Sequence, residues 1–407
     1  MSKKRIYIFI AILILLAVAG WLIFYFFFGG QAPTTQGGGT FPAPPTGSGA
    51  GSDTETGIPQ KQPSQSVSAN SIPALRRLTD VPVAGGVAGV KNSVVIARYM
   101  ERGTGHILEI PVNSDTASRL SNTTIPKIYE AYASKDGLSF VARYLREGSE
   151  DIQTFSAKVQ EKGGVTGGGE LVGTFLPPNI RSLALSPDGS RAFYLTTTAS
   201  GSTGTASDTG GSKKVQIFSS PLRELTVSWP TNGTVAVATK ASAGQPGLLF
   251  FLNSTTGALQ TVLRDITGLL TLTSPDASEV LFSQSTNGGV ALSVYNKSKG
   301  VVTPISLATF PEKCLWSKKT AHTVLCAVPS SLPSGEYPDD WYQGLVGFSD
   351  DIWKIDTATG SVSELFALKN YTPESVDAVR LFTDPTEAFL FFINKRDGAL
   401  WALKLAK

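Results

Sequence analysis

The sequence predicts an all-β fold, a seven-bladed β-propeller, which follows a single transmembrane helix and a disordered linker. Three observations support this prediction. Short apolar stretches joined by tight turns recur along residues 73–407, they recur at about the length of one propeller blade, and no window in this region has the pattern of a long amphipathic helix. Gly and Pro, with 41 and 24 of the 407 residues, are abundant, as expected where many strands are connected by turns.

The N-terminal stretch predicts a membrane anchor. Residues 6–28 contain no charged side chain, and as a helix they would span about 34 Å, enough to cross a hydrocarbon layer of roughly 30 Å. Lys3, Lys4 and Arg5 precede this stretch, whereas residues 29–51 contain no Lys or Arg. By the positive-inside rule, we expect a signal anchor at residues 1–28, with the N-terminus in the cytoplasm and the propeller on the extracytoplasmic side.

A cleaved signal peptide is the alternative, because residues 17–19 (Ala-Val-Ala) resemble a small-residue cleavage site. Cleavage there would leave the aromatic and aliphatic residues 21–28 close to the new N-terminus, where they would be poorly soluble. We therefore expect the anchor to be retained. No cysteine precedes Cys314, which excludes attachment through a lipid-modified cysteine near the N-terminus.

Residues 29–72 contain mainly Gly, Pro, Ser, Thr and Gln, and almost no large apolar side chains. Such a segment buries too little surface to offset the entropy lost on ordering it, so we predict a flexible linker. As a coil, its mean reach would be on the order of 35 Å. The chain is thus divided into an anchor (1–28), a linker (29–72) and a propeller (73–407).

The charge balance argues against a nucleic-acid partner. The formal net charge is +3, and Lys3, Lys4 and Arg5 account for it, so the remaining chain is electrically balanced. Contact with a phosphate backbone requires a basic surface, which a neutral propeller lacks. We expect no nucleic acid among the partners of this protein.

The recurring unit is a strand, a tight turn and a second strand, best seen at residues 182–195 (SLALSPDGSRAFYL). The turns of its seven copies are centred near residues 92, 136, 188, 232, 276, 320 and 385, so four of the six intervals are 44 residues. Apolar stretches after each hairpin supply further strands, and four strands in about 44 residues form one propeller blade. The two longer intervals contain insertions at residues 163–169 and 330–349.

Two copies depart from this pattern. The seventh, residues 379–407, supplies only three strands, and residues 75–83 precede the first copy without a hairpin of their own. Since an open sheet edge favours aggregation, we predict that this N-terminal segment adds the missing outer strand and closes the ring. In the third copy, residues 199–212 are rich in Gly, Ser and Thr, and we expect a flexible loop that leaves little room for a fourth strand.

The turn Ser186-Pro187-Asp188-Gly189, between two apolar strands, resembles the WD40-like repeat of periplasmic propellers of the Tol system, and residues 274–276 are a weaker copy. Proline fixes φ, aspartate bonds to the nearby backbone and glycine accepts a positive φ, which suits a turn between strands. The resemblance implies a protein-binding platform in the cell envelope, and it transfers no catalytic residue. The Trp-Asp pair that ends a true WD40 blade is absent.

Cys314 and Cys326, the two cysteines of the sequence, lie on either side of the turn near Thr320. If they oppose each other directly on antiparallel strands, their Cβ atoms are close enough for a disulfide, and an oxidising compartment would favour that bond. A shift of one residue in the register would instead leave two buried free thiols. The sequence leaves both possibilities open.

Residues 334–353 have the most distinctive composition, with acidic and aromatic residues in close succession. Trp and Tyr are common in binding hot spots, and carboxylates can engage a basic partner or Ca²⁺. We expect a binding surface formed by Tyr337, Asp339, Asp340, Trp341, Tyr342, Asp350 and Asp351. The alternative is an ordered loop whose aromatic side chains cover the central channel.

These observations favour a membrane-anchored extracytoplasmic propeller that binds an envelope protein or peptide, without catalytic residues, metal or cofactor. His106 and His322 are isolated and belong to no metal-binding motif, and no nucleophile motif lies in a strand-to-helix setting. The alternative is a propeller enzyme that acts on envelope glycans through carboxylates near the channel. A third hypothesis is a structural spacer. The sequence predicts no oligomeric state.

Overall fold

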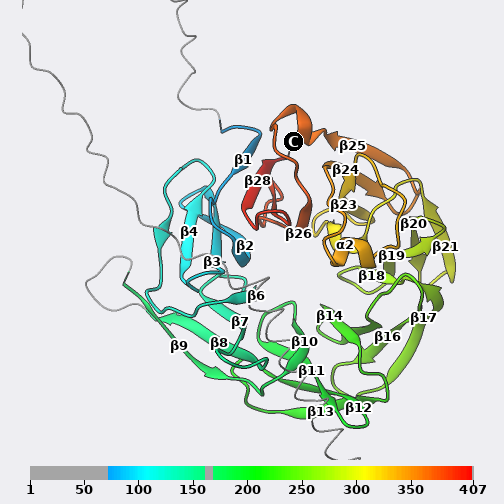
Figure 1. Cartoon of the computed structure of the whole chain (residues 1–407), viewed down its shortest axis with the longest axis horizontal. Coiled ribbons are helices and arrows are strands. Elements are labelled where there is room, and N and C mark those ends of the chain that lie inside the picture. The colour runs from blue at the N-terminus through cyan, green and yellow to red at the C-terminus, as the bar shows by residue number, and fades with distance from the viewer. Residues whose placement is uncertain (1–71, 161–167, 406–407) are drawn as a thin grey trace, which may run out of the picture. The chain divides into compact units, whose positions relative to one another are not determined.

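Seven antiparallel four-stranded sheets are arranged in a ring in the computed structural model, which describes residues 72–160 and 168–405 (Figure 1). The predicted all-β seven-bladed propeller is therefore confirmed, and each predicted hairpin forms the first two strands of a blade. The predicted anchor lies outside the described residues, as does the linker apart from its last residue. Within the two described ranges, no helix is long and apolar enough to cross a membrane.

Blades one to four each use four consecutive strands, the first of which lines the channel. Blade one contains β2 (Val83–Lys91), β3 (Val94–Glu101), β4 (Ile107–Pro111) and β5 (Ser118–Arg119). Blade two contains β6 (Ile128–Ala133), β7 (Ser139–Leu145), β8 (Ile152–Gln160) and β9 (Glu170–Phe175). Blade three contains β10 (Ile180–Leu185), β11 (Arg191–Thr198), β12 (Gly201–Asp208) and β13 (Val215–Ser220). Blade four contains β14 (Leu225–Thr231), β15 (Thr234–Thr239), β16 (Pro246–Asn253) and β17 (Leu259–Thr267).

Blades five to seven complete the ring. Blade five contains β18 (Leu270–Thr273), β19 (Glu279–Thr286), β20 (Gly289–Asn296) and β21 (Val301–Ile305). Blade six contains β22 (Cys314–Trp316), β23 (Thr323–Pro329), β24 (Asp350–Asp356) and β25 (Val362–Phe366). Blade seven contains β26 (Ala378–Thr383), β27 (Phe389–Asn394), β28 (Leu400–Lys404) and β1 (Leu75–Arg77). The short helical segments of the described chain are η1 (Pro311–Lys313), α2 (Asp339–Tyr342) and η2 (Leu368–Asn370).

The ring closes through the strand that precedes the first repeat. Strand β1 pairs antiparallel with β28, so that Leu75 lies opposite Leu403 and Arg77 lies opposite Trp401 (Figure 1). The Leu78 amide adds a hydrogen bond to the Leu400 carbonyl at 2.7 Å. The predicted closure is confirmed, because the N-terminal segment supplies the fourth strand that the last copy lacks.

The hydrophobic core lies between neighbouring blades. Strand β27 is buried at every position, because both of its faces are covered by other strands. Its phenylalanines divide between the two flanking blades, so that Phe391 packs in one cluster with Tyr99 of blade one and Phe392 packs in another with Leu325 of blade six. Strands covered on both faces have continuous apolar sequences instead of alternating ones, which explains the apolar stretches of the repeat.

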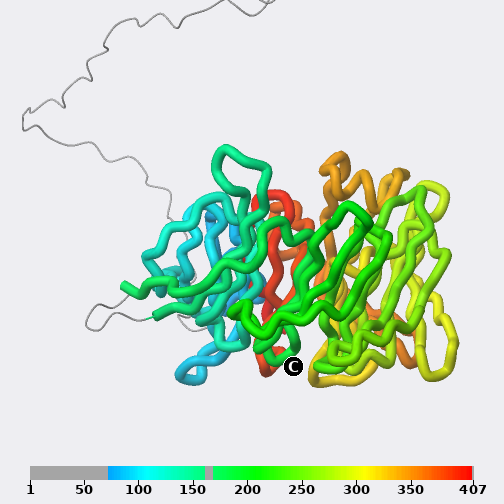
Figure 2. The backbone as a smooth tube through the Cα atoms, turned by 90° about the horizontal axis from the view of Figure 1, so that it is seen from below, coloured from blue at the N-terminus to red at the C-terminus, as the bar shows by residue number. Residues whose placement is uncertain are grey.

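The Ser-Pro-Asp-Gly motif builds a turn. In blade three, the Ser186 hydroxyl donates to Asp188 Oδ1 at 2.5 Å, and the Ser190 amide donates to the same oxygen at 3.1 Å. These bonds hold the pKa of Asp188 low, at about 2. Gly189 has a φ of 75°, which favours glycine over residues with a side chain. The same serine–aspartate hydrogen bond recurs at Ser134–Asp136 and Ser274–Asp276, so the motif that these blades share stabilises hairpin turns. Figure 2 shows the loops at both faces of the ring.

The prediction of a flexible loop at residues 199–212 was wrong. Most of that segment is β12, which pairs with β11 along its whole length, and β13 follows as a complete fourth strand. Its small residues have a packing reason, since a Cβ atom on Gly204 would lie 2.5 Å from the ring of Phe193 and 2.8 Å from Phe218. Two bulky neighbours therefore require a strand of small residues, which resembles a linker when composition alone is considered.

Candidate functional site in the central channel

A cavity of about 820 Å³ lies where the first strands of the blades converge. Five of these strands form its wall: β2, β6, β10, β14 and β26. Most of the side chains that they contribute are small or apolar, among them Ala131, Leu183, Leu185, Val227, Val379 and Leu381. Four charged residues also line the cavity: Glu130, Glu312, Arg380 and Lys395. The channel therefore combines an apolar wall with a small group of charges.

The loop between β23 and β24 completes the wall next to blades five and six. Its short helix α2 lies on the inner side of the ring (Figure 1), and Trp341 and Tyr342 of this helix line the cavity. The Trp341 ring stacks on Phe310 at a centroid distance of 5.0 Å and an interplanar angle of 9°. The rings of Tyr337 and Phe348 pack against the Phe310 ring, at centroid distances of 5.7 and 5.9 Å. An aromatic cluster thus covers one side of the channel.

Four residues of the predicted binding surface are buried instead of exposed. Tyr337 and Trp341 are 1% and 2% exposed, and Asp350 and Asp351 are also buried. Asp351 accepts hydrogen bonds from the Leu368 amide and the Ser330 hydroxyl, both at 2.9 Å. The structure differs from the prediction because the loop folds inward onto Phe310, which matches the alternative of an ordered loop over the channel.

Asp339 and Asp340 fix the loop to its surroundings. The Asp339 carboxylate accepts the Ala243 amide at 2.6 Å and the Ser242 hydroxyl at 3.0 Å, which ties the loop of blade six to the β15–β16 connection of blade four. Asp340 accepts the Glu336 amide at 2.8 Å within the loop itself. Tyr342 is then the predicted binding residue whose side chain is both exposed and part of the channel wall.

Behind the Trp341 ring, a lysine is completely buried between two carboxylates. Lys313 Nζ lies 2.5 Å from Asp377 Oδ1 and 2.8 Å from Asp350 Oδ2. Asp377 also accepts the Trp341 indole N–H at 3.0 Å and the Phe348 amide at 3.2 Å. Burial raises the pKa of Asp350 to about 6, against the opposing effect of Lys313. This Lys313–Asp350–Asp377 triad links η1, β24 and the start of β26, and it holds the aromatic cluster in place.

Glu312 and Tyr342 form a hydrogen-bonded pair at the channel. The Tyr342 hydroxyl donates to Glu312 Oε1 at 2.7 Å. Glu312 is open to water through the cavity but surrounded by protein on its other sides, and this burial raises the pKa of its carboxyl, although the Tyr342 hydrogen bond and Arg380 oppose the shift. Lys395 lies 4.8 Å from the Trp341 ring centroid and donates to the Trp341 carbonyl, and burial lowers the pKa of its ammonium.

A second charged network crosses the ring from blade seven to blade three. Arg380 donates to the Ala84 carbonyl at 2.6 Å and to Glu130 Oε1 at 3.2 Å. The other carboxylate oxygen of Glu130 accepts Arg143 at 2.5 Å, and Arg143 in turn donates to the Ile180 carbonyl. Glu130 is thus shared by two arginines, and the Arg143–Glu130–Arg380 chain carries one net positive charge.

Sequence reasoning did not single out the charged residues of the channel. Glu130 and Arg380 each lie in the first strand of a blade, which faces the axis, so a charge in that strand was the available signal. Glu312 and Lys395 lie in connections between strands, and no pattern of the sequence places them at the channel. Arg380 is further marked by its φ of 52° at a register shift between Val379 and Phe382, because bulges with unusual dihedrals often direct side chains at functional sites.

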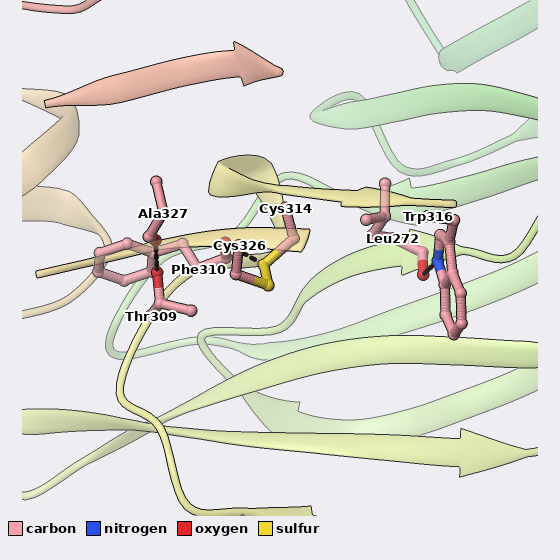
Figure 3. The surroundings of a disulfide bond; sticks show 7 residues. All are labelled: Leu272, Thr309, Phe310, Cys314, Trp316, Cys326 and Ala327. Carbon is pink, nitrogen blue, oxygen red and sulfur yellow. Dashed lines mark hydrogen bonds between the residues drawn. A yellow bond between two sulfur atoms is a disulfide. The ribbon is translucent and has the colours of Figure 1, made fainter. Parts of the chain in front are cut away.

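The structure joins Cys314 and Cys326 by a disulfide (Figure 3). The two residues are directly opposite each other on β22 and β23, which is the register that the bond requires. Hydrogen bonds lie on both sides of it: the Thr309 hydroxyl, before η1, donates to the Ala327 carbonyl at 2.6 Å, and the Trp316 indole of β22 donates to the Leu272 carbonyl at 3.1 Å. The disulfide therefore lies directly beside the segment that carries Glu312 and Lys313.

The two histidines lie apart from the channel wall. His106 is paired with the Thr124 hydroxyl at 3.3 Å, and His322 is paired with the buried carboxylate of Glu279 at 3.1 Å. Among residues 72–160 and 168–405, no group of three or more His, Cys, Asp or Glu side chains is arranged to hold a metal ion.

The sequence matches no protein-family profile and no curated protein. Solved structures that resemble the chain include TolB from Acinetobacter baumannii, with 10% identity and a TM-score of 0.44 over 68% of this chain and 64% of that one. The chain thus spans somewhat less than two thirds of that TolB structure. The β-propeller domain of the trilobed protease from Pyrococcus furiosus shows 11% identity and a TM-score of 0.49 over 79% of this chain and 95% of that one.

An oligogalacturonate lyase from Vibrio parahaemolyticus has 8% identity and a TM-score of 0.47 over 83% of this chain and 99% of its own. The names of these proteins include a protease, a lyase and TolB. All three TM-scores are below 0.5, so these likenesses support no statement on the function of this chain.

Proposed function

We propose that this protein is a membrane-anchored, extracytoplasmic binding propeller, and that a segment of an envelope partner enters its central channel. The observation that carries the proposal is the cavity of about 820 Å³, whose wall is apolar and whose accessible charges are few. A few polar groups in a concave, mostly apolar site are typical of ligand binding. The buried Lys313 triad and the aromatic cluster keep this wall in a fixed shape, which reduces the entropy lost on binding.

Two features support a location outside the cytoplasm. The uncharged residues 6–28 follow three cations, which favours a cytoplasmic N-terminus and an exported propeller. The Cys314–Cys326 disulfide agrees with export, because disulfides persist in oxidising compartments and are rare in the cytosol. Both features come from different parts of the chain and favour the same side of the membrane.

The proposed topology predicts where an external protease separates the propeller from the anchor. Lys61 is the sole Lys or Arg between residues 29 and 71, so trypsin added to intact spheroplasts should cleave after it and release the propeller into the medium. The Lys61→Gln variant should stay attached under the same conditions, as judged by immunoblotting of pellet and supernatant. Release that requires lysis of the spheroplasts would contradict an extracytoplasmic propeller.

The channel is expected to contact the partner directly. A photo-crosslinking phenylalanine analogue in place of Tyr342 should give an adduct with a second envelope protein on irradiation of whole cells, because this exposed ring forms part of the channel wall. The same analogue at Tyr371, which is 50% exposed after η2, serves as the matched control and should give no such adduct. The proposal fails if position 342 gives no adduct, or if both positions give the same one.

An enzyme that acts on envelope glycans is the second candidate, and Glu312 is the feature that favours it. A carboxyl with a raised pKa that is hydrogen bonded to a phenol inside a cavity is the kind of group that serves as a general acid. This candidate predicts that the protein releases soluble fragments from purified envelope glycans and that Glu312→Gln abolishes the release. The absence of any release by the native chain would leave the binding function.

A further inference from the structure

The channel offers a ligand two cations, Arg380 and Lys395, and one exposed carboxylate, Glu312. The carboxylates of Asp350 and Asp377 are 0% and 1% exposed and lie behind the Trp341 ring, and Glu130 is shared between two arginines and is 18% exposed. By contrast, the Arg380 side chain is 42% exposed. A ligand in the cavity therefore meets Arg380 and Lys395 as cations and Glu312 as the carboxylate open to the channel.

Both cations keep hydrogen-bond donors for a ligand. Arg380 has five N–H groups, and its bonds to Ala84 and Glu130 use two of them. Lys395 has three N–H groups and donates one to the Trp341 carbonyl. Both side chains line the same cavity as Glu312, and Lys395 bonds to the carbonyl of Trp341, the neighbour of the Tyr342 residue that holds Glu312. A carboxylate is the ligand group that fits a guanidinium and an ammonium placed in this way.

The aromatic rings of the channel favour a peptide over a sugar chain. Sugars bind to exposed ring faces, but Trp341 has Phe310 stacked against it and Lys395 over its ring, and Arg191 covers Trp229 at 5.3 Å. Tyr342 is more exposed, but one face of its ring is stacked on Trp341 at 5.6 Å. Much of the remaining wall consists of small and aliphatic side chains from the first strands, which suits an extended peptide with small or aliphatic residues.

Resting on the proposed binding function, we infer that the ligand of the channel is an extended peptide segment with an Asp or Glu side chain, whose carboxylate is held by Arg380 and Lys395. Glu312, which accepts a hydrogen bond from Tyr342, lies in the same cavity, and its negative charge disfavours a peptide with a second acidic side chain. The Arg143–Glu130–Arg380 chain keeps the Arg380 guanidinium oriented toward the cavity, because its bonds to Ala84 and Glu130 come from two other blades.

The test uses the full-length protein in detergent micelles and a library of random seven-residue peptides. Peptides recovered on the native protein should be enriched in Asp and Glu, and synthetic versions with Asn or Gln at those positions should bind roughly 10- to 100-fold more weakly, as expected for hydrogen bonds to a charged group. Arg380→Gln should reduce binding of the acidic peptides to a similar extent, whereas Arg380→Lys should retain part of it. The matched control Arg264→Gln, an exposed arginine on the outer strand β17, should change nothing.

A second variant separates loss of a contact from loss of folding. Lys395 lies in the connection between β27 and β28, whereas Arg380 lies in β26. Lys395→Met should therefore also weaken binding of the acidic peptides, while Lys214→Met, an exposed control, should not. Peptides that bind without acidic enrichment, or that bind Arg380→Gln and Lys395→Met as tightly as the native protein, would overturn the inference and leave the binding function intact. Binding of an oligomer of galacturonic acid, with no peptide recovered, would overturn the peptide assignment. No ligand of either kind, together with no adduct at position 342, would reject the proposed function itself.

Discussion

Replacing Lys313 with methionine is expected to lower the free energy of unfolding by about 3–5 kcal/mol. The lysine is 0% exposed and pairs with both Asp350 and Asp377, so its removal leaves two buried carboxylates without this cation. Methionine fills a similar volume, so the decrease in the free energy of unfolding results from the lost charge and not from a new cavity. Equilibrium urea unfolding of the full-length protein, followed by tryptophan fluorescence, measures the change.

The exposed Lys299→Met variant is the matched control and should unfold like the native chain. Removing the charges together, in Lys313→Met with Asp350→Asn and Asp377→Asn, should recover much of the lost stability, because no unpaired charge then remains buried. Equal stability of Lys313→Met and Lys299→Met would show that the triad does not stabilise the fold. The same unfolding curve in all variants would also remove the argument that the triad holds the channel wall.

The blade pattern was predictable from sequence because each hairpin turn is a local structure. The Ser-Pro-Asp-Gly turn at residues 186–189 bonds within itself, and the interval between turns is set by the number of strands in a blade. Ring closure was predictable for a related reason, since blade seven lacks one strand and residues 75–83 have no hairpin partner. Local hydrogen bonds and a count of strands were sufficient in both cases.

The sequence did not predict strand β12 because its small residues are required by packing against the neighbouring strands β11 and β13. Gly204 is required by the ring of Phe193 and the Cβ atom of Phe218, and no local pattern distinguishes such a strand from a Gly- and Ser-rich loop. The buried positions of Tyr337 and Trp341 were also not predictable from the sequence. Trp341 and Tyr337 have the composition of a binding surface, but aromatic residues are equally common in cores, and what decides between the two is the bond of Trp341 to Asp377, 36 residues away.

The charges of the channel were beyond sequence reasoning for a similar reason. Arg380 and Glu130 are separated by 250 residues and meet because blades seven and two both face the axis. Their pairing is a consequence of ring closure, so it becomes visible once the order of the blades is known. A repeat protein thus reveals its architecture through local signals, while its site is assembled from the positions at which the repeats differ.

Removing the disulfide should produce the other large effect. The bond links two residues that are 12 positions apart. Replacing both Cys314 and Cys326 with alanine should lower the free energy of unfolding by about 2–4 kcal/mol, chiefly because the unfolded chain gains conformational entropy without the bond. The loss should be accompanied by weaker binding at the channel, because β22 follows directly on η1, which carries Glu312 and Lys313. Urea unfolding with and without dithiothreitol measures the first effect, and crosslinking through position 342 measures the second.

Reduction provides the internal control. Dithiothreitol should bring the native protein close to the stability of the double-alanine variant and should leave that variant unchanged, since it has no bond to lose. Alkylation of the unfolded native protein without reductant should modify neither cysteine. If both thiols are alkylated, or if dithiothreitol leaves the native curve unchanged, the bond is absent from the protein in its compartment. If the disulfide is intact but its reduction does not change crosslinking through position 342, then Lys313 and its two carboxylates hold η1 in place without the covalent bond.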